Sequence, residues 1–186
     1  MIDVLKAINF SWKCIYFILP SAFANMAPVF FRKVPFLDCP VDFGANWKGK
    51  PIFGNHKTFR GFFFGILLSI LVVYIQSRLS AFQYFRNISL VAYSEYNFVL
   101  LGFLLGFGAL FGDLIESFVK RRRGINAGKR WVPWDQLDFI VGSIIFVSFV
   151  YLPPWQVITF LLIATPLLHI ALKHIGYYLH ISRAKW

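Results

Sequence analysis

The stretch YNFVLLGFLLGFGALFGDLIESFV, residues 96–119, is an apolar run that is long enough to cross a membrane as one helix. A hydrocarbon layer of about 30 Å needs roughly 20 helical residues. Small residues let membrane helices approach closely, so the glycines of this run predict helix–helix contacts. These are Gly102, Gly106, Gly108 and Gly112. The stretch therefore predicts a transmembrane helix that lies close against neighbouring helices.

The rest of the chain supports this class. Hydrophobic residues make up 58% of the 186 residues, and the mean hydropathy is +0.63, both high for a soluble domain. Four more apolar segments are expected to be helices, at residues 8–31, 58–78, 137–152 and 155–175. The predicted fold is all-α: one integral membrane helical bundle, residues 1–186, with about five transmembrane helices and no soluble domain.

Basic residues are concentrated in alternate loops, which predicts the orientation of the bundle. They are Arg32, Lys33, Lys48, Lys50 and Lys57 in the first loop, Lys120 to Arg123, Lys129 and Arg130 in the third, and Lys173, Arg183 and Lys185 in the tail. These two loops and the C-terminus are expected in the cytoplasm of a multi-pass cell-membrane protein, with the N-terminus outside. The same rule and anionic headgroups account for the net charge of +11, so nucleic acid is not expected as a partner.

The first loop, GANWKGKPIFGNHKTFRG at residues 44–61, is rich in glycine, lysine and polar residues. Thr58 is placed to cap the following helix, whose N-terminal N–H groups attract anions. Lys57 and Arg60 flank that position. The loop is either a phosphate cradle or a positive-inside anchor with an ordinary helix cap, and it lacks the P-loop spacing.

Two pairs of carboxylates flank the third loop at the same spacing. Asp113 and Glu116 share one face of their helix, as do Asp135 and Asp138. Glu116 has a simpler explanation as a partner of Lys120 one turn later, and Asp135 has one as a helix N-cap. Asp113 has no such structural explanation, and a charge placed among apolar residues costs a few kcal/mol. The pairs predict a divalent metal site, with Mg²⁺ shared between carboxylates and phosphates.

Around these carboxylates the sequence resembles CTP-dependent phosphatidate cytidylyltransferases. The matching residues are Asp113, the run Ser117-Phe118-Val119-Lys120-Arg121, Pro133, and Asp135-Gln136-Leu137-Asp138. The family pattern has Arg where this chain has Gln136, and a His-Gly-Gly before the aspartates where this chain has Pro133-Trp134. The element PIFGNHKTFRG and the short five-helix architecture are more similar to the archaeal branch, the CDP-archaeol synthases.

The resemblance implies a nucleotidyltransferase of phospholipid biosynthesis in archaea. Its substrates would be CTP and a lipid phosphate such as digeranylgeranylglyceryl phosphate, and its products CDP-archaeol and pyrophosphate. The implied metal ligands are Asp113, Glu116, Asp135 and Asp138, with Mg²⁺ as cofactor. The implied nucleotide-binding residues are Asn55, His56, Lys57, Thr58, Arg60, Lys120 and Arg121. Asp113, Lys120, Arg121, Asp135 and Asp138 would act in catalysis.

Two other readings stay open at this point. A CDP-alcohol phosphotransferase or a prenyltransferase also uses paired aspartates with Mg²⁺ at a membrane surface. A small transporter would place Asp113 in a translocation path. The lipid bilayer is a partner in each case, and the sequence leaves the oligomeric state open, together with the roles of Arg122, Arg123, Lys129 and Arg130.

Overall fold

The structure, a computed structural model, describes residues 2–178 of the chain and the side chains of residues 3–168. Lys173, Arg183 and Lys185, on which part of the orientation argument rests, therefore fall outside the described side chains. The elements in chain order are α1 (Ile2–Phe30), β1 (Asn46–Trp47), β2 (Lys50–Pro51), α2 (Phe59–Leu79), α3 (Gln83–Asn87), α4 (Phe98–Arg122), α5 (Trp134–Val147) and α6 (Trp155–Tyr178).

Each of the five predicted apolar segments is a helix, so the predicted helical membrane fold is confirmed. Within the described part of the chain, α1, α2 and α4 are long and apolar enough to cross a membrane on their own. α5 has 14 residues and spans about 21 Å at 1.5 Å per residue, which is shorter than the hydrocarbon layer. The number of complete crossings therefore stays a prediction.

The helix boundaries follow from local capping. The Thr58 hydroxyl accepts a hydrogen bond from the Gly61 N–H at the start of α2, as the sequence predicts. Asn97 caps α4 by accepting from Val99 and Leu100. α5 starts earlier than expected, with Pro133 at its N-cap position, so the reading of Asp135 as the N-cap is wrong.

The glycines of α4 bring it against two different helices. A Cβ at Gly102 would lie 2.6 Å from Ile70 Cα on α2, and one at Gly106 would lie 2.6 Å from Ser69 Cβ. On the other side, a Cβ at Gly108 would meet the Gly142 carbonyl of α5 at 2.6 Å. α4 is therefore packed between α2 and α5, and its last turns lie directly beside the start of α5. The close helix contacts that the glycines predict are present.

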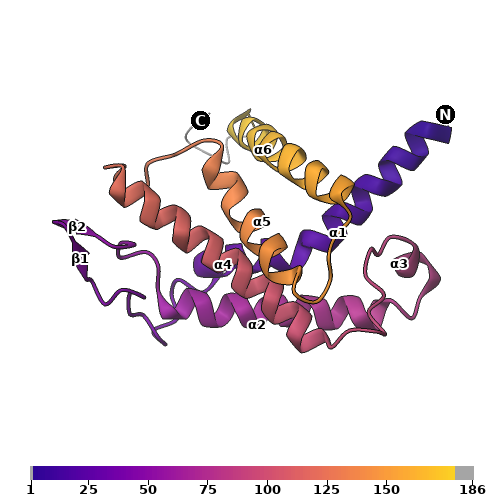
Figure 1. The fold of residues 1–186 in the computed structure, drawn as a ribbon, viewed down its shortest axis with the longest axis horizontal. Coiled ribbons are helices and arrows are strands. Elements are labelled where there is room, and N and C mark those ends of the chain that lie inside the picture. The colour runs from indigo at the N-terminus through magenta and orange to yellow at the C-terminus, as the bar shows by residue number, and fades with distance from the viewer. Residues whose placement is uncertain (1, 179–186) are drawn as a thin grey trace.

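The polar loops gather at one end of this bundle. The β1–β2 hairpin lies at the end where α4 finishes and α5 begins, while the short helix α3 lies at the opposite end (Figure 1). The hairpin turn has positive φ at Lys48 and Gly49, 51° and 73°, as a type I′ turn requires. The end with the hairpin is the one that carries the predicted site residues.

Candidate active site

Three carboxylates converge where α4 meets α5. Asp113 and Glu116 lie one turn apart on α4 and Asp138 lies in the first turns of α5; one oxygen of each comes within 4.8 Å of the other two. This approach depends on Gly112, because a Cβ there would lie 2.9 Å from the Asp138 carbonyl carbon and closer still to its oxygen. Gly112 in α4 therefore allows carboxylates that are distant in the sequence to lie close together.

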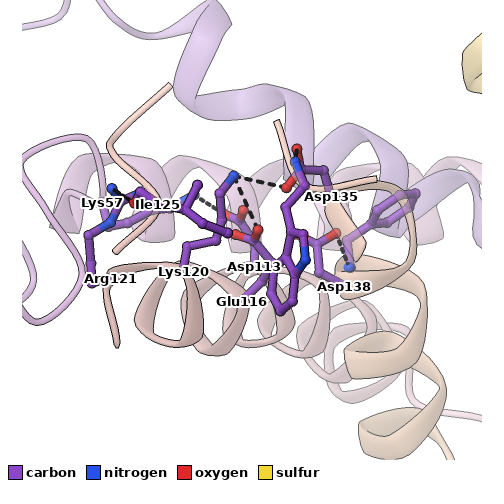
Figure 2. Close-up of polar contacts among 10 residues, drawn as sticks. Lys57, Asp113, Glu116, Lys120, Arg121, Ile125, Asp135 and Asp138 are labelled. Carbon is purple, nitrogen blue, oxygen red and sulfur yellow. Dashed lines mark hydrogen bonds and ion pairs between the residues drawn. The ribbon is translucent and has the colours of Figure 1, made fainter. Parts of the chain in front are cut away.

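Lysines from both predicted loops bind these carboxylates (Figure 2). Lys57 Nζ, just before α2, lies 2.5 Å from Asp113 Oδ2. Lys120 Nζ lies 3.2 Å from Glu116 and 2.9 Å from Asp135. The first and third loops are thus joined at one site, and Lys57 supplies the partner that the sequence does not reveal for Asp113.

Asp135 shares Lys120 with Glu116. One of its oxygens accepts from Lys120, and the other accepts from the Trp131 backbone N–H at 2.8 Å. In the described part of the chain the cluster able to hold a metal contains Asp113, Glu116 and Asp138. The structure thus groups three of the four carboxylates that the sequence singles out, and gives Asp135 the position of a partner to Lys120.

The cluster fits a hard divalent cation. Glu116 Oε1 is buried and has no hydrogen-bond partner of good geometry, although Lys120 Nζ is near it. Lys57 and Lys120 supply two positive charges for the four carboxylates Asp113, Glu116, Asp135 and Asp138, which leaves negative charge for a further cation to neutralise. Carboxylate oxygens are the donors that Mg²⁺ prefers, and it commonly shares them with substrate phosphates. The donor set therefore fits Mg²⁺ between Asp113, Glu116 and Asp138.

A polar hollow of about 270 Å³ opens beside the carboxylates. The predicted nucleotide residues His56, Lys57, Lys120 and Arg121 line it, with the carboxylates opposite. A second hollow of about 330 Å³ continues from it, sharing His56 and Arg121, and Asn55 lines this second part. Together they form a cationic and polar cavity with a carboxylate cluster on one wall.

Thr58 and Arg60 lie outside both hollows. Thr58 is buried as the cap of α2. The Arg60 guanidinium is also buried, where it pairs with Asp38 at 2.8 Å and donates to the Val34 carbonyl. Arg60 therefore holds the first loop onto α2. Its position in the sequence is equally consistent with this role and with phosphate binding.

An apolar groove of about 410 Å³ runs between α4 and α5 on the other side of the carboxylates. Its lining includes Ile115, Trp134, Val141 and Ile145. Glu116 and Asp138 line both this groove and the polar hollow. The carboxylate cluster thus lies at a junction between a charged cavity and an apolar surface.

Asp42 fixes the shape of the first loop. Its carboxylate accepts from the N–H groups of Gly44, Phe53 and Gly54 at 2.9 to 3.3 Å. Burial by itself raises the pKa of Asp42, but these backbone hydrogen bonds outweigh it and hold the pKa below its usual value. The loop that carries Lys57 is therefore an ordered element.

Further residues of the first loop and of the Ser117–Arg121 run line these hollows, although the sequence assigned them no role of their own. Ser117 lines the polar hollow, and Lys50, Pro51 and Gly54 line its continuation. The hairpin turns at Lys48-Gly49, where both residues have positive φ. Its contact with α4 depends on the tertiary fold.

Known proteins resemble this chain over most of its length. Residues 4–186 match the protein family described as CDP-archaeol synthase. A CDP-archaeol synthase of Methanococcus maripaludis is 38% identical over 94% of this chain and 96% of its own length. One of Pyrococcus furiosus is 35% identical over 92% of this chain and 95% of its own length.

A solved structure, described as an intramembrane enzyme for archaeal membrane lipid biosynthesis, has the same fold. It superposes with a TM-score of 0.68 at 29% identity, covering 85% of this chain and 90% of the other. The phosphotransferase, prenyltransferase and transporter readings have no support in these matches. The chain belongs to the CDP-archaeol synthase family, whose members are CTP-dependent nucleotidyltransferases of membrane lipid synthesis.

Proposed function

We propose that this chain, as a single catalytic membrane domain, transfers the cytidylyl group of CTP to a lipid phosphate such as digeranylgeranylglyceryl phosphate. The observation that supports this most is the position of Glu116 and Asp138, which line both the polar hollow and the apolar groove. A reaction between a water-soluble nucleotide and a lipid needs such a junction, because the two reacting phosphates must meet while their remaining parts lie in different surroundings.

The nucleotide occupies the polar cavity in this proposal. Lys57 from the first loop and Arg121 from the last turn of α4 line the hollow and bind phosphate oxygens. Asn55 and His56 lie farther along toward the nucleoside. Asp113, Glu116 and Asp138 hold Mg²⁺, which when bound neutralises phosphate charge. The positive charge of Lys120 offsets negative charge on Glu116 and Asp135. This weakens the repulsion between these carboxylates and a nearby triphosphate.

The lipid occupies the groove between α4 and α5. Its chains pack against Ile115, Val141 and Ile145, and its phosphate lies at the polar end, where Arg123 lines the groove. The Arg123 guanidinium is held 5.0 Å from the centre of the Trp131 ring, a cation–π distance. Arg123 is thereby placed near the carboxylates without being bonded to them.

The reaction needs positioning and charge neutralisation more than proton transfer. An ionised oxygen of the lipid phosphate attacks the α-phosphorus of CTP, and the bond from that phosphorus to the bridging oxygen of the β-phosphate breaks. CDP-lipid and pyrophosphate form. Lys57 and Arg121 stabilise the charge that develops on the leaving pyrophosphate, and the closed junction aligns the two phosphates.

We also infer that this end of the bundle faces the cytoplasm, where CTP is available. The basic residues of the first and third loops support this orientation by the positive-inside rule.

The experiment that tests the function uses the purified full chain in detergent. Each of the four NTPs is incubated with Mg²⁺ and a lipid phosphate, and both pyrophosphate and CDP-lipid are measured. CTP with lipid phosphate is expected to react, EDTA to stop the reaction, and Mg²⁺ to restore it. Asp138→Asn is expected to abolish turnover, whereas Asp3→Asn, the same change on an exposed side chain far from the site, leaves it intact. Turnover in verified absence of divalent metal contradicts the metal role.

A further inference from the structure

We propose that Arg122 is a positioning residue, which fixes the β1–β2 hairpin as one wall of the nucleotide cavity and so determines nucleotide affinity without touching the nucleotide. This inference rests on the proposed function in one respect, namely that the nucleotide occupies the two polar hollows. The fixation of the hairpin itself is independent of that function.

The Arg122 guanidinium bonds to three carbonyl oxygens of the hairpin. Nη1 donates to Trp47 O at 2.5 Å, and Nη2 donates to Lys50 O at 3.1 Å and Pro51 O at 2.5 Å. Both strands are therefore held by one side chain at the last residue of α4. The planar fork of a guanidinium can reach several acceptors at once, which a lysine ammonium does less well.

Aromatic contacts complete this attachment. Trp47 of the hairpin stacks on Phe118 of α4, with ring centres 5.7 Å apart and planes at 15°. The Arg122 guanidinium lies 5.3 Å from the Trp47 ring centre and 5.4 Å from that of Phe118. These distances are in the cation–π range. The hairpin is thus joined to α4 through Arg122, Trp47 and Phe118 together.

The hairpin has little stability of its own. Each strand has two residues, paired as Asn46 with Pro51 and Trp47 with Lys50, and all four are exposed. A short two-stranded hairpin is marginally stable in water. Its position against α4 therefore depends on the contacts that Arg122 makes.

The position of the hairpin matters because Lys50 and Pro51 line the second hollow. Arg121 lines both hollows and donates to the Ile125 carbonyl at 2.6 Å, whereas Arg122 lines neither of them. The two consecutive arginines thus have different tasks. Arg121 faces the nucleotide, and Arg122, turned to the hairpin, keeps Lys50 and Pro51 in place opposite it.

The test compares Arg122→Ala and Arg122→Lys with Arg86→Ala, which removes the same charge and two guanidinium–carbonyl hydrogen bonds from α3 at the opposite end of the bundle. Amide hydrogen exchange of residues 45–52 measures how firmly the hairpin is held, and it does not depend on enzymatic activity. Loss of even one charge-assisted hydrogen bond corresponds to about a tenfold change. Exchange in these residues and the KM for CTP are each expected to rise about tenfold in Arg122→Ala. kcat and the KM for lipid are expected to stay near the wild-type values.

Arg122→Lys separates positioning from charge. If Arg122 fixes the hairpin, lysine restores neither the slow exchange nor the low KM for CTP, and Arg86→Ala changes neither of them. Full rescue of the KM by lysine, or faster hairpin exchange with an unchanged KM for CTP, overturns the proposal. Unchanged hairpin exchange in Arg122→Ala overturns it as well. If wild-type protein does not use CTP, the proposed function fails, while the exchange data still show whether Arg122 holds the hairpin.

Discussion

Gly112→Ala changes no charged group, yet it is expected to inactivate the enzyme. The added Cβ would lie 2.9 Å from the Asp138 carbonyl carbon, whereas ordinary van der Waals contacts begin at 3.4 Å. The carbonyl oxygen is closer still, and a packed backbone cannot yield locally, so α5 must move away by about 1 Å. Asp138 moves with it, away from Asp113 and Glu116.

The magnitude follows from the demands of the metal site. Mg²⁺ requires near-ideal geometry, with oxygens at about 2.0–2.1 Å, and a misplacement of about 1 Å at a reacting centre costs roughly a hundredfold. We therefore expect kcat to fall by about two orders of magnitude, and more Mg²⁺ to be needed for half-maximal activity. Overpacking itself should cost about 1–3 kcal/mol of stability.

The matched control is Gly102→Ala, whose Cβ would lie 2.6 Å from Ile70 Cα on α2, about three helical turns before Asp113 along α4. Both variants should lose stability, but only Gly112→Ala should lose activity per folded molecule. The assay is CTP-dependent turnover with the folded fraction measured by size-exclusion chromatography in detergent. Equal activity per folded molecule in the two variants would refute the claim that the α4–α5 contact assembles the site.

Three further predictions concern the loops. Lys57→Ala should lower CTP affinity about ten- to one-hundredfold, since a charge-assisted hydrogen bond is worth roughly 1.5–3 kcal/mol. Arg60→Ala should instead lower Tm and leave CTP binding intact, because Arg60 pairs with Asp38. Asp42→Asn should speed amide exchange at Phe53 and Gly54 relative to wild type. The folded protein holds the pKa of Asp42 below its usual value. The difference in exchange rate should therefore be largest above the pKa of Asp42 in the unfolded state and vanish as the pH falls through its pKa in the folded state. In a background without Cys14 and Cys39, Lys129→Cys should react with an impermeant thiol reagent from the cytoplasmic side and Ser89→Cys from outside, and the reverse pattern would contradict the orientation.

The sequence by itself determined the helices and much of the chemistry. Apolar runs and caps are local properties, so the helix at residues 96–119 and the Thr58 cap follow from neighbouring residues alone. The spacing of Asp113 and Glu116 places both on one helix face for the same reason. The glycines of α4 predict close neighbours, although they do not say which helix each glycine meets.

The tertiary structure decided which of these groups meet. Asp135 and Asp138 have the same spacing as Asp113 and Glu116, yet only Asp138 joins the carboxylate cluster, because the Gly112 contact sets how α5 is turned against α4. Lys57 and Arg60 look alike in sequence, but Lys57 reaches Asp113 while Arg60 is held by Asp38. The hairpin wall at Arg122 and the apolar groove likewise join distant segments. Such contacts depend on how whole helices pack, which no local pattern of residues specifies.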